Sequence, residues 1–267
     1  FMSITDTRTI WVIDAQSIFC QNGVPFAFSL NKLTNLQNFN LDDVIHLTDG
    51  NFALDKQNIP NLDINLPQGE FIAYRHLVGR LNNTLAGLFS QAIQLIYFHK
   101  THQFCGVCGH KTIKNTLENN HIYTHRICTH CQHHIYPKIQ PCVIVAITRL
   151  HPTTQKPQIL LAKHHRHTDI YTLIAGFVEI GETLERATAR EVYEEVGLQI
   201  DTPMYFNSQA WPYPTNLMVG FIAKYRSGKI ILQQDELNDA RFFDVDKLPN
   251  LPSCGTIARK IIDAVCH

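Results

Sequence analysis

The stretch from Gly176 to Leu198 constrains the fold of this chain more than any other part of the sequence. Thr183 is a residue type that caps a helix N-terminus, and Gly197 is one that ends a helix, so a helix is predicted between them. Apolar residues fall on adjacent faces of this helix, as expected for a helix packed on a core. These residues are Leu184, Ala187, Val192 and Val196.

Three carboxylates crowd the end of the predicted helix. Glu191, Glu194 and Glu195 stand at i, i+3 and i+4, where like charges repel by roughly 0.2–0.5 kcal/mol per pair. Acids in a last turn also oppose the helix dipole, by about 0.3–1 kcal/mol each. A solvated acidic face would place basic residues three or four positions away, and only Glu194 has one, Arg190. The pattern therefore predicts a divalent cation with oxygen ligands to neutralise Glu191 and Glu195.

The same stretch resembles the Nudix box at every defined position. The resemblance implies an α/β/α sandwich with a mixed sheet, and hydrolysis of a nucleoside diphosphate linked to a second group. By motif position it implies that Glu191 and Glu195 are metal ligands and that Glu195 is the base or orients the water. Glu191, Glu194 and Glu195 are the candidate catalytic residues. Glu182 and Arg190 are expected to brace the loop and the helix. The matching positions are Gly176, Glu182, Arg190, Glu191, Val192, Glu194, Glu195, Gly197 and Leu198.

Two Cys-x-x-Cys pairs form the second constrained feature. Cys105 and Cys108 make one pair, Cys128 and Cys131 the other, and 19 residues (109–127) separate them. This spacing predicts a four-cysteine zinc ribbon. Redox or disulfide pairs are the alternative, and the sequence shows no secretory signal that would favour them. Four thiolates fill a tetrahedral site, so the zinc is expected to be structural and the nearby histidines to be exposed to solvent. These histidines are His110, His125, His130, His133 and His134.

A loop is expected at Ser208–Asn216, which reads Ser-Gln-Ala-Trp-Pro-Tyr-Pro-Thr-Asn. It is similar to the Ser-Gln-Pro-Trp-Pro-Phe-Pro-x-Ser motif of Nudix NADH pyrophosphatases, which include bacterial enzymes that remove NAD caps from RNA. It departs from that motif at Ala210, Tyr213 and Asn216. A rigid aromatic loop that only packs on the core is the alternative. Two prolines and an aromatic pair also suit a preorganised wall for flat rings.

The order of parts extends the resemblance over most of the chain. Tyr136-Pro137-Lys138 follows the cysteines, and Gly255-Thr256-Ile257-Ala258-Arg259 lies near the end. The resemblance implies that the carbonyl of Ala175 and the side chain of Glu236 are further metal ligands, and that the protein forms a homodimer. Without it, Glu236 would be interpreted as a surface acid. The candidate substrate-binding residues are Tyr136, Phe177, Gln209, Ala210, Trp211, Pro212, Tyr213, Pro214, Thr215, Asn216 and Ala258.

The sequence divides into three regions that differ in composition and in their pattern of predicted helices and strands. We expect an N-terminal, β-rich α+β domain at 1–100, the zinc ribbon at 101–137 and the Nudix catalytic domain at 138–267. The first region predicts strands at 10–13 and 44–47 and helices at about 71–81 and 85–100. The last predicts strands and a C-terminal helix in the alternation typical of an α/β domain. Its strands are expected at 142–149, 158–163, 171–178 and 217–225.

Composition excludes some classes of function. Lys and Arg together number 23, as do Asp and Glu, so a protein that relies on non-specific nucleic-acid contacts is disfavoured. The longest apolar runs are too short to span a membrane, and no signal peptide is visible, so a cytoplasmic location without membrane partners is predicted.

The sequence thus predicts metal-dependent hydrolysis of the pyrophosphate bond of NAD(H) to NMN(H) and AMP, and removal of NAD caps from RNA. The expected cofactors are roughly two or three Mg²⁺ or Mn²⁺ ions and one Zn²⁺. One alternative is a Nudix hydrolase of ADP-ribose or a diadenosine polyphosphate. Another is a zinc-ribbon regulator that binds nucleic acid and senses a ligand with its Nudix domain.

Overall fold

The computed structural model describes residues 9–29, 40–59, 67–115, 125–165 and 169–266. The chain divides into two compact units. The first comprises Phe1–Lys138 together with Pro212–Thr215, and the second comprises Ile139–Trp211 and Asn216–His267. Within the described residues, no helix is long and apolar enough to cross a membrane.

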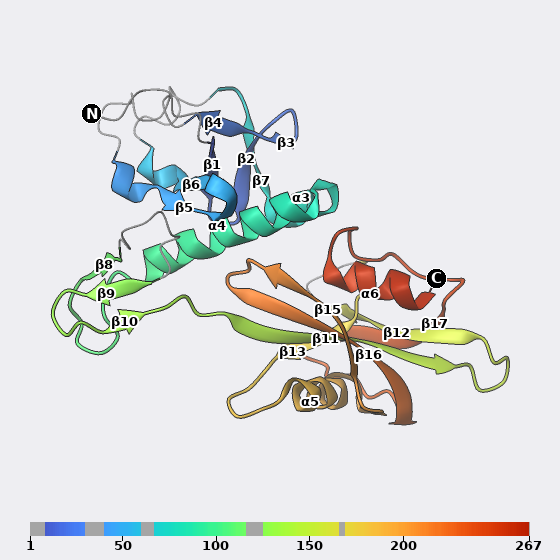
Figure 1. Ribbon diagram of the computed structural model, residues 1–267. Helices are drawn as coiled ribbons and strands as arrows, with labels where there is room; N and C mark the ends of the chain where they lie inside the picture. The colour runs from blue at the N-terminus through green and yellow to red at the C-terminus, as the bar shows by residue number, and fades with distance from the viewer. Residues whose placement is uncertain (1–8, 30–39, 60–66, 116–124, 166–168, 267) are drawn as a thin grey trace. The chain divides into compact units, whose positions relative to one another are not determined.

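The first unit is built on a seven-stranded sheet (Figure 1). Its main path runs β3–β2–β1–β6–β5, with β4 paired to β1 and β7 paired to β2. Strands β1 and β6 are parallel, and the other pairs are antiparallel. The strands are β1 (Thr9–Asp14), β2 (Ser17–Gln21), β3 (Val24–Pro25), β4 (Ala27–Ser29), β5 (Ile45–His46), β6 (Phe52–Asp55) and β7 (Glu70–Ala73).

The helix predicted at 85–100 is confirmed as α4 (Asn83–Thr101). The Asn82 side chain caps its first turn by accepting a hydrogen bond from the Leu85 N–H. Phe89 on α4 is buried, and its ring meets the edge of Trp11 on β1 at 5.0 Å between centroids. The helix therefore packs on the sheet through aromatic contacts.

The helix predicted at 71–81 is wrong in its first part. Residues 70–73 form β7, and only Tyr74–Leu77 (α3) and the 3₁₀ turn Val78–Arg80 (η4) are helical. Pairing of Phe71 with Phe19 on β2, and contact between their rings at 5.3 Å, outweigh the local helical periodicity. The strand predicted at 44–47 is shorter than expected. Further 3₁₀ turns lie at Leu41–Asp43 (η1), Thr48–Gly50 (η2) and Lys56–Asn58 (η3).

The cysteine region forms a small antiparallel sheet of three strands in the order β10–β9–β8. These strands are β8 (Thr112–Lys114), β9 (Arg126–Cys128) and β10 (His134–Ile135). Cys105 and Cys108 lie before β8, Cys128 ends β9, and Cys131 lies in the turn after it.

The second unit contains a seven-stranded mixed sheet, in the order β14–β16–β11–β12–β17 with β13 on β11 and β15 on β16. Strands β11 and β16 are parallel, and the remaining pairs are antiparallel. The strands are β11 (Gln140–Leu150), β12 (Pro157–His164), β13 (Ile174–Phe177), β14 (Leu198–Ile200), β15 (Met204–Trp211), β16 (Asn216–Gly228) and β17 (Leu237–Asp244).

Two helices cover opposite faces of this sheet (Figure 1). Val143 and Val145 of β11 belong to the core cluster that contains residues of α5 (Leu184–Val196). Ile144 and Ala146 belong to the cluster that contains residues of α6 (Ile257–Cys266). Side chains of a strand alternate between faces, so this division places one helix on each side. The predicted α/β/α sandwich with a mixed sheet is confirmed.

The segment 208–216, expected as a loop, is mostly strand. Residues up to Trp211 belong to β15, and Asn216 begins β16, so only Pro212–Thr215 turn between them. Ser208 pairs with Val219 in the antiparallel ladder, which supplies hydrogen bonds that a loop would lack. The strand predicted at 171–178 is also shorter, because β13 begins at Ile174.

Candidate active site

The carboxylate helix begins and ends where the capping residues indicate. The Thr183 hydroxyl accepts a hydrogen bond from the N–H of Arg186 at 3.3 Å. Gly197 has a φ of 68°, the left-handed conformation that favours glycine after a helix. Val192 and Val196 are fully buried on the face that meets the sheet. The acids of the last turns are not members of this apolar cluster, although Glu195 is itself buried.

Arg190 is the centre of a network of charges. It donates two hydrogen bonds of 2.9 Å to the carboxylate of Glu182, and one of 2.8 Å to each of Glu191 and Glu194. A further bond of 2.8 Å reaches the carbonyl of Phe177. The expectation that Glu191 lacks a basic neighbour is therefore wrong, because one nitrogen of the Arg190 guanidinium donates to both Glu191 and Glu194. Arg190 ties the loop after β13 to α5.

Glu191 lies against Gly176 on β13. A Cβ atom built on Gly176 would come within 1.9 Å of the Glu191 carboxyl carbon, so only glycine fits at this position. Burial raises the pKa of Glu191, the Arg190 guanidinium lowers it, and the nearby charges of Glu194 and Glu236 raise it further. A bound cation would therefore stabilise the ionised form of the Glu191 carboxylate.

Glu195 is 1% exposed and lies beside two residues from other elements. One ligand atom each of Glu195, Glu236 and His164 all lie within 4.8 Å of one another. Sequence reasoning missed His164, which stands at the end of β12 where the register with β17 shifts. Nothing local in the sequence distinguishes it from the neighbouring histidines.

Backbone hydrogen bonds position Glu236. The N–H of Gln233 donates to the carbonyl of Glu195 at 2.9 Å, which fixes the segment before Glu236 to the end of α5. The N–H of His165 donates to the carbonyl of Glu236 at 3.0 Å, which fixes it to the end of β12. A residue that is distant from α5 in sequence is thereby placed beside Glu195.

This group of residues fits a hard divalent cation. Carboxylate oxygens are the ligands that Mg²⁺ prefers, and imidazole nitrogen also suits Mn²⁺ and later transition metals. Ala175, whose carbonyl is a candidate ligand, lies on β13 and pairs with Ile144 of β11. It immediately precedes Gly176, so its backbone lies next to the residue against which Glu191 packs.

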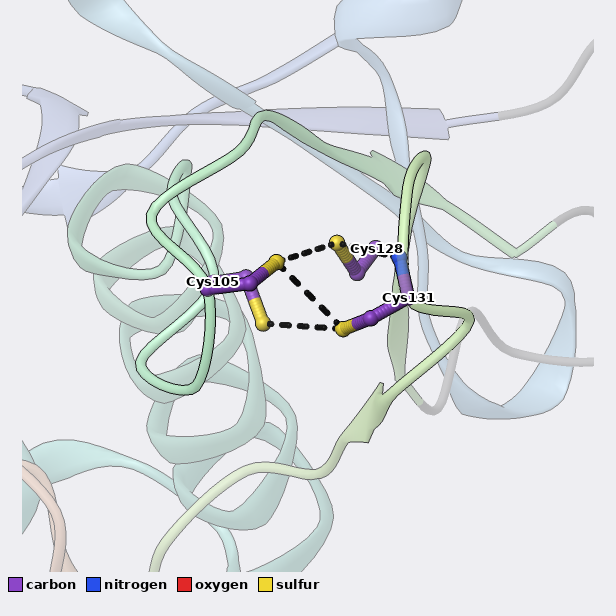
Figure 2. A group of neighbouring side chains, drawn as sticks. Cys105, Cys128 and Cys131 are labelled. Carbon is purple, nitrogen blue, oxygen red and sulfur yellow. Dashed lines mark hydrogen bonds between the residues drawn. The ribbon is translucent and has the colours of Figure 1, made fainter.

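The four cysteines of the first unit gather as the spacing predicts (Figure 2). The Sγ atoms of Cys108 lie 3.4 Å from those of Cys128 and Cys131, and Cys105 Sγ lies 3.7 Å from Cys131 Sγ. Four sulfurs around a tetrahedral Zn²⁺ would lie roughly 3.8 Å apart, given Zn–S bonds of about 2.3 Å. The observed separations are close to this value, so the four sulfurs fit a tetrahedral zinc site.

The backbone around Cys128 favours the thiolate form of its side chain. The N–H groups of His130 and Cys131 both point at the Cys128 sulfur at 3.4 Å, and that of Val107 points at Cys105. Burial opposes ionisation of Cys128, but these backbone donors and the neighbouring thiols lower its pKa to about 6. The thiolate is the form that binds metal.

The prediction of exposed histidines holds for His110, His130, His133 and His134 but is wrong for His125. His125 is 6% exposed, and its Nε2 lies 3.0 Å from the amide of Asn115. Its ring also stacks on Tyr136 at 4.9 Å between centroids. A core of stacked rings beside β9 and β10 explains its burial.

The two aromatic residues expected to stack on substrate belong to different units. Phe177 of the second unit is 53% exposed at the end of β13. Tyr136 of the first unit is 58% exposed and carries the stacked His125 on one face. Both rings present accessible surface.

The 208–216 segment makes structural contacts at both ends. The Gln209 amide donates to the carbonyl of Gly255 at 2.9 Å and accepts from the N–H of Ile257 at 2.7 Å, which holds the start of α6. In the first unit, the Tyr213 hydroxyl accepts from the N–H of Arg75 at 2.9 Å. Ala210 and Trp211 lie on β15, and Asn216 opens β16. Pro212, Pro214 and Thr215 form the turn.

Ala258, expected to line the substrate pocket, is 7% exposed near the start of α6. It belongs to the core cluster between α6 and the sheet. The Gln209 amide fixes the backbone of its neighbour Ile257. Its position is therefore set by β15 as well as by its own helix.

Comparison with known proteins agrees with this geometry. The NUDIX domain model matches residues 140–265. A NAD-capped RNA hydrolase NudC from Haemophilus influenzae (strain PittGG) is 46% identical over 200 residues, which are 73% of this chain and 71% of the relative. The protein of the same name from Salmonella heidelberg (strain SL476) is 43% identical over 203 residues, which are 72% of this chain and 75% of the relative.

Among solved structures, the chain is similar to a NUDIX hydrolase from Nitrosomonas europaea, at 25% identity and a TM-score of 0.44. The match covers 55% of this chain and 80% of that one. The level of identity to the NudC relatives, over more than two thirds of each chain, shows that this chain belongs with them to the Nudix family.

Proposed function

We propose that this protein hydrolyses the pyrophosphate bond of NAD(H) to NMN(H) and AMP, and removes NAD caps from RNA to leave a 5′-monophosphate end. The observation that carries the proposal is the group formed by Glu195, Glu236 and His164 next to Glu191, in a chain 46% identical to a protein named NAD-capped RNA hydrolase. An intact set of acids is what a hydrolase needs and what a binding module can lose.

Residues of three elements, together with Glu236 just before β17, would hold Mg²⁺ or Mn²⁺. They are Glu191 and Glu195 of α5, Glu236, the carbonyl of Ala175 on β13 and, from the geometry, the imidazole of His164 on β12. Such ions, when bound, would neutralise the charge of the pyrophosphate and make water more acidic. Cys105, Cys108, Cys128 and Cys131 would hold Zn²⁺ in a closed site with a structural role.

The side chains of the site would have different roles. Glu195, buried at 1% exposure, would orient the attacking water and take its proton. Arg190 keeps Glu191 and the loop bearing Glu182 in place through its hydrogen bonds. Glu194 is half exposed and shares the same guanidinium, so a supporting role suits it better than direct contact with the reacting atoms.

The substrate would contact residues that the fold leaves accessible or holds rigidly. The exposed face of Phe177 would stack on a flat ring, with Tyr136 in the same role, and the β15–β16 turn would supply a preorganised wall. The hydrogen bond from the Ile257 N–H to Gln209 fixes the start of the helix that carries Ala258. A homodimer and a cytoplasmic location stay predictions.

The test is turnover of NADH, NAD, ADP-ribose and an NAD-capped RNA with Mg²⁺ or Mn²⁺, with products identified by mass. We expect NMNH or NMN to be released faster than ribose 5-phosphate is released from ADP-ribose. Preferred cleavage of ADP-ribose would show a Nudix hydrolase of different specificity. Retention of the RNA without hydrolysis of any compound would overturn the proposal in favour of a binding protein.

A further inference from the structure

The first unit contains a cavity of about 610 Å³ between α4, the turn η1 and the strands of the cysteine region. This volume lies within the roughly 300–1,000 Å³ typical of sites for small ligands. The cavity is lined by four cationic side chains and three carboxylates. The cations are Lys100, Lys111, Lys114 and Arg126, and the carboxylates are Asp42, Asp43 and Asp55.

Two of the four cations are already balanced. Lys100 forms an ion pair of 2.8 Å with the buried carboxylate of Asp55. Lys114 donates to the carbonyl of Asp42; burial lowers the pKa of Lys114, and the charges of Asp43 and Asp42 oppose this shift. The acids that line the cavity are therefore accounted for by these two lysines.

Arg126 has a different set of contacts. It is 8% exposed, and its guanidinium donates to the hydroxyl of Thr112 at 2.7 Å and to the Thr112 carbonyl at 2.8 Å. Among the described residues, no carboxylate forms an ion pair with it. A buried charge without a counter-charge is costly, so the site gains from an anion. Lys111, which is exposed at the same cavity, adds a second positive charge.

His99 of α4 also lines the cavity and contacts Arg126. It is 7% exposed, and its Nδ1 lies 3.4 Å from a guanidinium nitrogen of Arg126. Because arginine can only donate, Nδ1 must accept, and the ring proton then resides on Nε2. Burial, followed by the charges of Lys114 and Arg126, lowers the pKa of His99 to about 3, in keeping with a neutral ring. Within the described residues, Nε2 has no hydrogen-bond partner.

We propose that this cavity binds a nucleoside monophosphate, whose phosphate lies against His99, Arg126 and Lys111. A phosphate would balance the buried charge of Arg126 through charge-assisted hydrogen bonds, which are stronger than neutral ones. The exposed side chains of Phe104 and Ile113 line the cavity and offer an apolar surface to a base. The site is separate from the carboxylates of the second unit and does not depend on hydrolysis there.

The experiment compares AMP, inorganic phosphate and adenosine by hydrogen–deuterium exchange of the full chain, without added Mg²⁺ or Mn²⁺. We expect AMP and phosphate, but not adenosine, to protect peptides that cover 96–104 and 108–114. Location of the protection separates this cavity from the second unit, so failure here leaves the proposed hydrolysis untouched. Absence of phosphate-dependent protection in these peptides would overturn the proposal, as would equal protection by adenosine.

Calorimetry on variants gives a second readout. Arg126 also holds Thr112, so its replacement tests folding as much as binding, and Lys111→Gln is the better variant. We expect Lys111→Gln to weaken AMP binding at this site about tenfold, as for loss of one charge-assisted hydrogen bond. Lys229→Gln, an exposed lysine of the second unit, serves as the matched control and should bind as the wild type does. Equal affinity of Lys111→Gln and the wild type would contradict the proposal.

Discussion

The cysteine cluster and the carboxylate cluster are both suited to metals, but they are assembled in opposite ways. The cysteines lie in two short segments, each of which includes a turn, and backbone N–H groups of the same segments point at the sulfurs of Cys105 and Cys128. The carboxylate cluster takes Glu195 from α5, Glu236 from the segment before β17 and His164 from β12. We expect the cysteine region to need its metal in order to fold, because its ligands come from short local segments. The carboxylate cluster lies on a large sheet that folds without metal.

The largest effect is expected from a substitution in the cysteine cluster. Cys128→Ser should reduce bound zinc from one ion per chain to none and unfold the strands β8–β10, because structural zinc contributes about 10–16 kcal/mol in small modules. Metal analysis and hydrogen exchange of the full chain would measure both changes. Cys254→Ser, an exposed cysteine outside the cluster, is the control and should keep its zinc. Full zinc content in Cys128→Ser would contradict the assigned ligand set.

The next prediction concerns the carboxylate cluster of the second unit, where a substitution should reduce activity without loss of folding or zinc. Gly176→Ala would drive a Cβ into the Glu191 carboxylate, and we expect NADH turnover to fall by about 100-fold through displacement of that group. Thermal unfolding should still show a folded chain with zinc bound. Gly87→Ala in α4 is the matched control: nothing lies within 4 Å of its added Cβ, so it should stabilise by about 0.5–1 kcal/mol. Turnover of Gly176→Ala near the wild-type rate would contradict this role for Gly176.

Removal of the Arg190 hydrogen-bond network should have a smaller effect, which is a loss of stability that depends on pH. Arg190→Gln is expected to cost about 1.5–3 kcal/mol of unfolding free energy at pH 7. Hydrogen bonds from Arg190 are the main cause that lowers the pKa of Glu182, so this contribution is present above the usual Glu182 pKa of 4.5. This stabilising contribution is lost as the pH falls through the lowered pKa that Glu182 has in the folded protein. Urea unfolding of the wild type and Arg190→Gln should therefore converge in acid.

The control for this experiment is Arg186→Gln, which removes an exposed arginine one turn earlier on α5. Its stability should stay within about 0.5 kcal/mol of the wild type at every pH. A constant difference between the wild type and Arg190→Gln down to strongly acidic pH would show that ionised Glu182 is not the partner that matters.

The smallest expected effect concerns the choice of metal. His164→Gln should weaken Mn²⁺ binding about tenfold and Mg²⁺ binding less, because nitrogen ligands favour the transition metal. Calorimetric titration of each metal measures the ratio. His151→Gln, in the turn between β11 and β12, should leave both affinities unchanged. Equal losses for the two metals would show that His164 acts only through the position of Glu195.

The contrast between the two clusters also explains what the sequence could predict. Cysteine spacing and the caps at Thr183 and Gly197 are local signals, and the structure agrees with both. The proximity of His164 to Glu195 depends on how β12 meets the end of α5, which no local pattern encodes. The failure at 71–81 has the same origin, since Phe71 pairs with a strand fifty residues earlier in the chain. Glu236 could be identified only through resemblance to a family.

The most direct test of the account is hydrolysis of NADH by the wild type and by Glu195→Gln, with products identified by mass. The account predicts NMNH and AMP from the wild type. It predicts a loss of roughly 10²–10⁴-fold in Glu195→Gln, as for removal of a general base, with an unchanged fold by circular dichroism. Release of free nicotinamide by the wild type, or a near-normal rate in a folded Glu195→Gln, would contradict it.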